Sequence, residues 1–450
     1  MGLPPGPPLP APLQTLLWIA RPLGLMEACR ERYGSVFTLR FTGLGVSQRI
    51  VFVSDPAGIR AVFGADPDQL QAGSANVALG ALLGENSLLL LDGREHLRQR
   101  KLMLPPFHGE RMRGYEEAMR SITLDRVRQW PQHSVFPMLP EMQAITLEVI
   151  LRTVFGFDDA VQRDQMRTRL QRMLALGSGT ARVAMLAFGR VELGGLSPWG
   201  RFVAAKRAVD EALQAQIERR RAAGIDGHDD VLSMLIAARD EDGRPLTDAE
   251  LRDELITLLV AGHETTATAL AWAFDLLLHH PHTLEAVVAA IDAGDTRYPD
   301  AVIKETLRIR PVVPIVARYL RQPFTVMGHD LPAGSVVAPC IYLTQRRADV
   351  YTQPDSFRPE RFIEGAPDTY AWLPFGGGVR RCLGASFAQF EMRVVLSTVL
   401  SALRLSPADD SFDDTTRRAV TLVPRRGVRV TVDGERERRP ALRDAEPISA

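Results

Sequence analysis

One short segment combines a run of glycines, two arginines and a cysteine: Phe375-Gly-Gly-Gly-Val-Arg-Arg-Cys-Leu-Gly384. Three consecutive glycines let the backbone approach another group closely and adopt positive φ. The residues from Ala385 onward have the apolar periodicity of a helix, so Cys382 comes just before a helix N-terminus. Arg380 and Arg381 lie beside it. Both features are expected to lower the pKa of the thiol and favour a thiolate, which acts as a nucleophile or as a metal ligand.

The surroundings of Cys382 favour a metal ligand. A nucleophilic cysteine needs a histidine as base, and the local sequence contains none. A glycine turn, in contrast, lets backbone amides point at the sulfur of an iron ligand and tune it. Most lone cysteines are small buried hydrophobes, and this is the interpretation for Cys29 and Cys340. The chain has no CxxC pair, so a structural zinc site has no support.

A second stretch predicts one very long helix. Thr247-Asp-Ala-Glu250 is a capping box, an apolar pattern follows, and Pro281 ends the segment after about 33 residues. The middle of this helix, Ala261-Gly-His-Glu-Thr-Thr266, contains poor helix formers. Glu264 stands there in an apolar run, where an unsatisfied carboxylate is costly. We interpret this segment as a functional break in the helix, although a solvent-facing polar turn is the plainer alternative.

Composition excludes several classes of protein. The 450 residues are 46% hydrophobic and 24% charged, which is ordinary for a globular chain. Fifty-four basic residues balance fifty-four acidic ones, so no global field attracts nucleic acid. Three cysteines are too few to stabilise a chain of this length by disulfide bonds, so a reducing, cytoplasmic location is expected. No apolar run reaches the ~20 residues that span a bilayer.

The coarse pattern of elements is helical in the centre and strand-rich toward the ends. Helical periodicity dominates from about 95 to 290. Five segments with β-branched or aromatic residues read as strands, namely 35–41, 49–54, 324–327, 335–338 and 428–432. The predicted class is therefore mainly α with a smaller β region (α+β), in one large domain. We expect a Pro-rich N-terminal arm over 1–25, a main domain over 26–435, and a disordered C-terminal tail over 436–450.

Four motifs, taken together in this order, resemble those of cytochromes P450. Phe375-x-x-Gly378-x-Arg380-x-Cys382-x-Gly384 is similar to the haem-binding loop of that family. The other three are similar to its oxygen-activation motif, its buttressing helix pair, and the segment that completes the buttress: Ala261-Gly-x-Glu264-Thr265, Glu305-x-x-Arg308 and Pro359-Glu-Arg361-Phe. The resemblance covers nearly the whole chain and implies the P450 fold, with the long central helix over a haem.

This resemblance implies a haem b whose iron is bound by the Cys382 thiolate, with Phe375 and Gly384 in the cofactor loop. Thiolate ligation favours O–O cleavage, the chemistry of a monooxygenase that uses O2 as co-substrate. Glu264 and Thr265 stand where the family has its acid–alcohol pair. We therefore expect Thr265 to hydrogen-bond dioxygen or its water, Glu264 to belong to the proton relay, and Gly262 to let the helix open locally. His263 receives no catalytic role.

Two further groups of residues follow from the same resemblance. The haem propionates need cationic partners, and the positions that match such partners are His96, Arg100, Arg318 and Arg380. A solvated basic surface is the alternative for any one of them. Glu305, Arg308 and Arg361 are expected to form a buried charge network that fixes the geometry of the cysteine loop.

Electrons are expected from a separate ferredoxin and an NAD(P)H-dependent ferredoxin reductase, because no flavin or nucleotide motif follows the cysteine loop. Residues 94–113 carry six basic and two acidic side chains. With Arg381, they predict a positive patch on the thiolate side that suits an acidic ferredoxin. Arg98 and Lys101 belong to this predicted patch. The chain is expected to act as a monomer.

The predicted pocket is apolar and indicates a lipophilic substrate, such as a fatty acid, terpenoid or steroid. Its expected lining includes Ala261, Val313, Val316 and Leu422. Hydroxylation or epoxidation is the expected reaction. The alternatives are a haem-thiolate isomerase, a peroxygenase, which would have an arginine in place of the acid–alcohol pair, and a haem-binding sensor, which would need an output domain.

Overall fold

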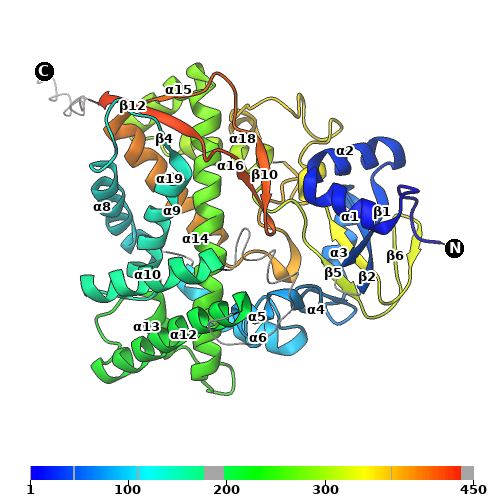
Figure 1. Ribbon diagram of the computed structural model, residues 1–450, viewed down its shortest axis with the longest axis horizontal. Helices are drawn as coiled ribbons and strands as arrows, with labels where there is room; N and C mark the ends of the chain where they lie inside the picture. Colours follow the sequence, from blue (N-terminus) through cyan, green and yellow to red (C-terminus); the bar gives the residue numbers. More distant parts are fainter. Residues whose placement is uncertain are drawn as a thin grey trace, which may run out of the picture.

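The computed structural model describes residues 2–43, 46–107, 109, 111–176, 197–365 and 367–436. Helices make up most of these residues, and a smaller β region lies beside the N-terminal segment (Figure 1). The prediction of an α+β fold built around a long central helix is confirmed. No helix among the described residues is long and apolar enough to cross a membrane.

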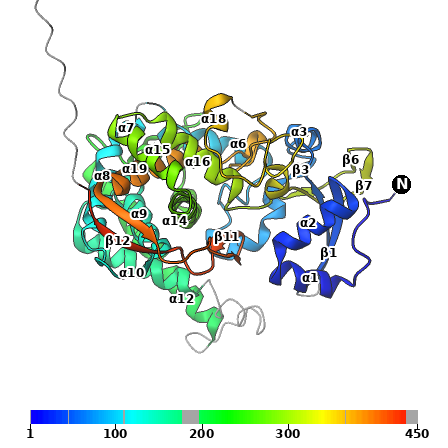
Figure 2. The same cartoon turned by 90° about the horizontal axis from the view of Figure 1, so that it is seen from above.

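The central helix is α14, Asp248–Leu278, whose 31 residues extend over about 46 Å. It begins at the predicted capping box, in which the Glu250 amide donates to Thr247 Oγ1 at 3.2 Å and the Thr247 amide donates to Glu250 Oε2 at 2.7 Å. Every residue over 266–278 is buried. Figure 2 shows α14 end-on in the middle of the helical part, so this apolar segment forms the centre of the core.

The expected break in the middle of α14 is wrong, because the helix continues without interruption through Ala261-Gly-His-Glu-Thr-Thr266. Gly262 serves packing instead: a Cβ there would lie 3.3 Å from Ile150 Cδ1 of the π-helical turn η3, Ile150–Val154. Two carbonyls of the motif also accept bonds from hydroxyls. Thr265 Oγ1 donates to Ala261 O at 2.5 Å, and Thr146 Oγ1 donates to His263 O at 3.1 Å.

Other helices surround α14. Its packing partners include α9, α12, α16 and α19, and α8 packs on α19. The bounds of these five helices are Glu116–Val127 (α8), Met138–Val149 (α9), Pro198–Ala223 (α12), Arg297–Ile309 (α16) and Ala385–Ala402 (α19). Further helices of this part are α10 (Ala160–Leu176), α13 (Val231–Ala237) and α15 (Pro281–Asp292).

A five-stranded sheet joins strands from residues 36–71 with strands from residues 318–339. Its order is β1-β2-β8-β5-β3, and β2 pairs in parallel with β8 although they lie far apart in the sequence. The antiparallel pairing of β5 with β8 brings Arg318 opposite Val337. The bounds are Val36–Gly43 (β1), Val46–Val53 (β2), Leu70–Gln71 (β3), Arg318–Leu320 (β5) and Val336–Pro339 (β8).

The five predicted strands are confirmed with shifts of a few residues at their ends. Smaller sheets pair β4 and β9 with β12, β6 with β7, and β10 with β11. Their bounds are Phe136–Pro137 (β4), Phe324–Val326 (β6), His329–Leu331 (β7), Leu403–Pro407 (β9), Thr415–Arg418 (β10), Thr421–Pro424 (β11) and Arg429–Glu435 (β12).

The Pro-rich N-terminal segment lies against strand β1. Thr38 donates its amide to Pro5 O at 2.9 Å and its hydroxyl to Pro4 O at 2.7 Å. The helices α1 (Ala11–Ala20) and α2 (Pro22–Tyr33) follow, and both pack on β1. Short helices complete this side and the cysteine loop: α3 (Pro56–Gly64), α4 (Ala72–Ala75), α5 (Gly80–Leu83), α6 (Gly93–Met103), α7 (Arg111–Gly114), α17 (Ile341–Thr344) and α18 (Arg361–Glu364).

The predicted C-terminal tail, 436–450, lies outside the described residues except for Arg436. The Arg436 amide donates to Ala402 O at 2.8 Å, and its Nη2 pairs with Asp292 Oδ2 at 2.7 Å. These bonds hold the end of β12 against the helical part.

Candidate functional site

The cysteine loop is fixed by its own backbone and by helix α3. The Cys382 amide donates to Phe375 O at 2.9 Å, which closes the loop. Gly376 and Gly378 both have φ of 65°, a conformation that favours glycine. A Cβ on Gly377 or Gly378 would lie 2.5 Å from the ring or the carbonyl oxygen of Phe63. The close approach that the glycines were expected to permit is therefore toward Phe63 of α3.

Cys382 lies two residues before Gly384, the N-cap residue of α19. Its side chain has accessible surface, although protein atoms crowd it closely enough for burial to raise the pKa of the thiol. The Gly384 amide, Arg100 and Arg381 oppose the effect of burial. The expectation of a lowered pKa is thus wrong in its net direction, because sequence shows the nearby charges but not the desolvation.

Arg380 points away from the thiol and toward the segment before α6. Its Nη1 donates to Leu88 O at 3.0 Å, and its Nη2 pairs with Asp92 Oδ1 at 2.6 Å and also donates to Leu91 O. Asp92 in turn accepts the Gly73 amide at 2.8 Å. Asp92 was not predicted as a site residue, because its position before a helix marks only a possible N-cap.

The four predicted propionate ligands come together in one cluster. Burial, together with the nearby charges of Arg380, Arg100 and Arg318, lowers the pKa of His96 to about 3. The Arg318 side chain donates to Ala317 O at 2.9 Å, and it forms no ion pair within the described residues.

Asp92 is the acid that pairs with this cluster, through Arg380. Burial also lowers the pKa of Arg318 to about 10, so the cluster holds cations that lack enough negative partners. An anion with two carboxylates fits this excess positive charge. The residues present therefore fit the haem that the sequence motifs imply, with its propionates at the cation cluster and Cys382 as the iron ligand.

Glu305, Arg308 and Arg361 form a buried network behind the cysteine loop. Glu305 and Arg308 are fully buried on α16 and make a bidentate pair at 2.7 and 2.8 Å. Arg361 Nε lies 3.0 Å from Glu305 Oε1. Arg308 Nη1 also donates to the carbonyls of Gln345 and Pro354. Because Arg308 bonds the Glu305 carboxylate and these backbone carbonyls at the same time, it fixes the positions of the segments that contain Gln345 and Pro354.

Gln345 connects this network to the cysteine loop. Its amide nitrogen donates to the carbonyls of Leu307 and Arg308 at 3.0 and 2.9 Å, and its oxygen accepts the Leu373 amide at 2.8 Å. Trp372 Nε1 adds a second tie by donating to Lys304 O at 3.2 Å. The sequence around Gln345 carries no motif, so its position could not be predicted. Through these bonds α16 holds the residues that lead into Phe375.

The acid–alcohol pair of α14 is partly covered by the β10–β11 hairpin. Arg418 of β10 lies with Nε 3.4 Å from Glu264 Oε1. Burial raises the pKa of Glu264, and Arg418 opposes that shift. The preceding His263 is buried, and burial lowers its pKa to about 4. Thr265 is half-buried, and its hydroxyl bonds within the helix. The pairing with Arg418 is a long-range contact that the sequence did not reveal.

The Arg418→Gln variant tests this pairing. Without the cation the pKa of Glu264 should rise further, so ionised Glu264 should destabilise the folded state more. At acidic pH the carboxyl is protonated in folded and unfolded chains, and Arg418→Gln should then have no charge-dependent effect. As the pH rises toward neutrality, the loss in melting stability should grow to at most about 1 kcal/mol, because both side chains are partly exposed. In a Glu264→Gln background, the loss of stability caused by Arg418→Gln should no longer increase with pH. If it still increased, the pairing of Arg418 with Glu264 would be contradicted.

The predicted pocket residues fall into two groups. Ala261 is exposed toward the space beside α14, and Val313 and Val316 are partly exposed. Leu422 is only 3% exposed, and its backbone ties β11 to the core by accepting from Trp272 Nε1 and donating to Val312 O. The structure therefore brings Ala261 and Thr265 onto one helix face, while Leu422 packs behind that region.

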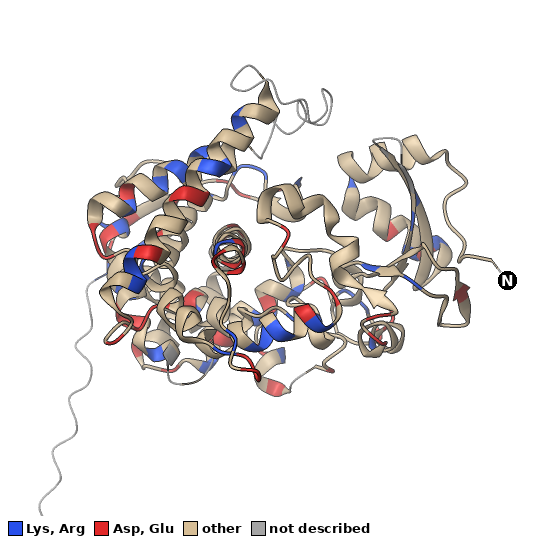
Figure 3. Ribbon diagram, turned by 90° about the horizontal axis from the view of Figure 1, so that it is seen from below, with Lys and Arg blue, Asp and Glu red and all other residues tan. Residues whose placement is uncertain are grey.

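Two of the six basic residues in the predicted patch over residues 94–113 are paired with acidic side chains. Arg98 pairs with Asp240 at 2.7 Å and with Glu250 at 2.8 Å, and Lys101 pairs with Glu241 at 2.7 Å. Basic and acidic residues are interspersed along the helices (Figure 3). The prediction rested on the cations of one segment, and the sequence does not reveal that the loop with Asp240 and Glu241 packs on it. Arg381, in contrast, is exposed.

Comparisons with known proteins point to one family. The family model for Cytochrome P450 matches residues 4–432. A mycobacterial relative from Mycobacterium tuberculosis, cytochrome P450 135B1, is 44% identical over 97% of this chain and 93% of its own length. Cytochrome P450 137 from the same organism is 40% identical over 96% of this chain and 91% of its own length.

Two solved structures are similar in fold. Retinoic acid-bound cyanobacterial CYP120A1 has a TM-score of 0.80 and 26% identity, and it covers 96% of this chain and 99% of its own. The cytochrome P450DA heme domain has a TM-score of 0.82 and 25% identity, and it covers 97% of both chains. The similarity in structure thus extends over the same nearly complete length as the similarity in sequence.

Proposed function

The chain belongs to the cytochrome P450 family of monooxygenases, and from that premise we propose that it inserts one atom of O2 into a lipophilic substrate. The observation that carries the proposal is the position of Arg100. Its guanidinium interacts with Cys382 and also with His96 of the cation cluster. One space is therefore bordered by a thiol and by cations, as a propionate-bearing macrocycle with a thiolate ligand requires. When bound, a thiolate-ligated haem supplies O–O cleavage.

The chain's own residues handle the proton. Thr265 Oγ1 donates its proton to Ala261 O, and rotation of the hydroxyl away from this carbonyl would let it pass the proton to a neighbouring acceptor. Glu264 is favoured in its protonated form by burial, which suits a carboxyl that must donate. Arg418 holds this carboxyl near the hairpin. Glu264 and Thr265 are consecutive on α14 and do not face each other directly, so a water is proposed to carry the proton from the acid to the hydroxyl.

Thr265→Val should separate electron consumption from product formation. The variant keeps the shape of the side chain but removes the hydroxyl that holds the proton. Product per NAD(P)H should fall by about 100-fold or more, the size of a lost acid–base group, while oxygen uptake continues with release of hydrogen peroxide. Oxygen-electrode and peroxide assays beside product analysis measure the split. Thr257→Val on the same helix serves as the control, since its hydroxyl bonds Ser87 and Asp253 O. An unchanged yield in Thr265→Val would contradict the proposed relay.

The proposed substrate is a fatty acid, a terpenoid or a similar natural product, oxidised by hydroxylation or epoxidation. The apolar side chains of Ala261, Val313 and Val316 are at least partly exposed. We propose that they border the space beside the acid–alcohol pair, where such a lining would favour lipophilic molecules. One structural relative is described with retinoic acid bound, a lipophilic acid of terpenoid type. Screening fatty acids, terpenes and steroids for substrate-induced spin shifts, followed by product analysis, tests this proposal. A product formed equally well with hydrogen peroxide alone would favour the peroxygenase alternative.

Electrons are proposed to come from a ferredoxin that docks near Arg381. Because Arg98 and Lys101 are occupied by acidic partners, the exposed Arg381 beside the cysteine loop is the better probe. Arg381→Glu should slow reduction by a ferredoxin severalfold at low ionic strength, and the difference should shrink as salt screens the charges. Stopped-flow reduction measures it. Arg297→Glu, at the start of α16, is the control for general surface charge. An equal rate in wild type and Arg381→Glu would contradict this docking site.

A further inference from the structure

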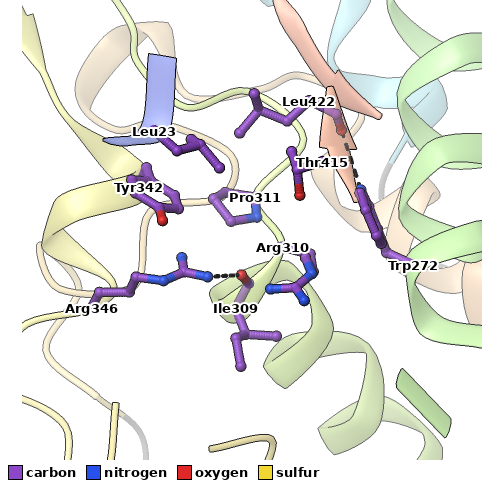
Figure 4. Close-up of a pocket in the computed structure, with 9 residues that line it drawn as sticks. All are labelled: Leu23, Trp272, Ile309, Arg310, Pro311, Tyr342, Arg346, Thr415 and Leu422. Carbon is purple, nitrogen blue, oxygen red and sulfur yellow. Dashed lines mark hydrogen bonds between the residues drawn. The ribbon is translucent and has the colours of Figure 1, made fainter. Parts of the chain in front are cut away.

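A small cavity between α14, α16 and the β10–β11 hairpin is bordered by two arginines. Its volume is about 50 Å³, and Arg310, Arg346, Tyr342 and Thr415 supply its polar groups (Figure 4). The remaining lining is apolar, with Leu422 and Trp272 among its members. None of its lining residues is acidic. Cys382 and Thr265 are not among the residues that line it, so the cavity differs from the space beside the cysteine loop.

Arg310 has a guanidinium without a matching acceptor. Within the described part of the chain its side chain makes no hydrogen bond or ion pair, and it lies over the Trp272 ring at 5.3 Å and near the Phe412 ring at 6.0 Å. Burial lowers the pKa of Arg310, and Asp275 compensates only in part. A cation that stacks on aromatic rings and makes no hydrogen bond leaves its donors free for a ligand.

Arg346 adds a second cation to the same cavity. Its Nη2 donates to Ile309 O at 2.5 Å, and its guanidinium lies 4.2 Å from the centre of the Tyr342 ring. Its carboxylate neighbour, Asp355, is 3.7 Å away and largely exposed, while Nη1 has no hydrogen-bond partner. Burial lowers the pKa of Arg346, and Arg310 lowers it further. The two cations therefore repel each other unless an anion lies between them.

We infer that this cavity binds a carboxylate whose attached group is apolar. A guanidinium fork matches a planar carboxylate bidentately, and the free donors of Arg310 supply such a fork. The Thr415 hydroxyl, which has no hydrogen bond among the described residues, can donate to the second oxygen. A single negative charge suffices, because Arg346 already has the Asp355 carboxylate at 3.7 Å. The apolar lining, with Leu422, receives the hydrocarbon part.

The ligand is either a free short-chain acid or the head of a long-chain acid. The backbone of Leu422, which borders the cavity, bonds to Val312 in the segment that leads to the predicted pocket residues Val313 and Val316. A long-chain acid with its head in this cavity would be the substrate, so this possibility rests on the proposed function. Carboxylate binding in the cavity is common to both, and it is measured without turnover.

Calorimetry on the haem-loaded protein tests the site with hexanoate, hexanol and inorganic phosphate. Hexanoate should bind saturably, and hexanol, which lacks the charge, should bind at least about tenfold more weakly. Arg310→Gln should weaken hexanoate by about tenfold or more, whereas Arg425→Gln, an exposed arginine after β11, should not change it. Equal binding of hexanol, tighter binding of phosphate, or full affinity in Arg310→Gln would overturn the inference.

A second variant and a second ligand complete the test. Arg310→Lys keeps the charge without the fork, so it should bind hexanoate more weakly than wild type even where Arg310→Gln does not fold. If Arg310→Lys and Thr415→Val both bound hexanoate as tightly as wild type, the proposed carboxylate site would also be contradicted. Palmitate distinguishes the two sources: a weaker palmitate-induced spin shift in Arg310→Gln supports the head of a long-chain substrate, and an unchanged shift with lost hexanoate binding supports a free short-chain acid.

Discussion

Replacing Arg308 with alanine is expected to lower the free energy of unfolding by about 3–5 kcal/mol, because it leaves a buried charge without its partner. Arg308 is fully buried and holds Glu305 through two bonds of 2.7 and 2.8 Å. Without it Glu305 keeps Arg361 and the Arg358 amide, but the carbonyls of Gln345, Pro354 and Ser356 lose their donor. Urea denaturation followed by circular dichroism measures the loss.

The control for this prediction is a partly exposed ion pair that involves the same helix. Arg393 of α19 pairs with Asp300 of α16 at 3.0 Å, and both side chains remain partly accessible. Arg393→Ala should therefore cost no more than about 1 kcal/mol. A similar loss in both variants would show that the buried network has no special part in stability. Loss of haem from Arg308→Ala at urea concentrations below its unfolding midpoint would support the role of α16 in holding the cysteine loop.

Replacing Cys382 with alanine is expected to remove monooxygenase activity. Cys382 lies just before α19, and its side chain is accessible although protein atoms crowd it. It also interacts electrostatically with Arg100 of the cation cluster. Changes to residues around a metal ligand already cost about 10–100-fold in activity, so loss of the ligand should cost more than about 100-fold. Turnover with a ferredoxin system, normalised to haem content, measures the effect.

Cys29→Ala is the control for this prediction. Cys29 is buried near Met26 and Leu25 of α2, and burial raises the pKa of its thiol to about 11. It should therefore stay protonated and leave activity within about twofold of wild type, since a buried thiol behaves as a small hydrophobe. Activity retained in Cys382→Ala, or lost equally in both variants, would contradict the assignment of the ligand.

Local patterns predicted the elements that carry the site. The capping box at Thr247 and Glu250 marked the start of α14 correctly, because both of its bonds form between residues three apart. The glycines before Cys382 marked a loop that needs positive φ, and Gly376 and Gly378 adopt it. Where a feature depends on residues within one turn or one loop, the sequence was sufficient.

Contacts between distant segments could not be predicted in the same way. Arg418 reaches Glu264 from a hairpin, Gln345 joins α16 to Leu373, and Asp240 neutralises Arg98 across an interface of the fold. Each depends on packing that no local pattern encodes. The raised pKa of Cys382 has the same origin, because desolvation depends on every neighbour in space and not only on the adjacent arginines.

The spectrum of the reduced, CO-bound protein tests the central claim most directly, namely that the Cys382 thiolate binds the iron of a haem. The account predicts a Soret band at the long-wavelength position of thiolate-ligated haem, and its loss in Cys382→Ala but not in Cys29→Ala. A Soret band at the short-wavelength position of haem without a thiolate ligand, in fully loaded and folded wild-type protein, would contradict it.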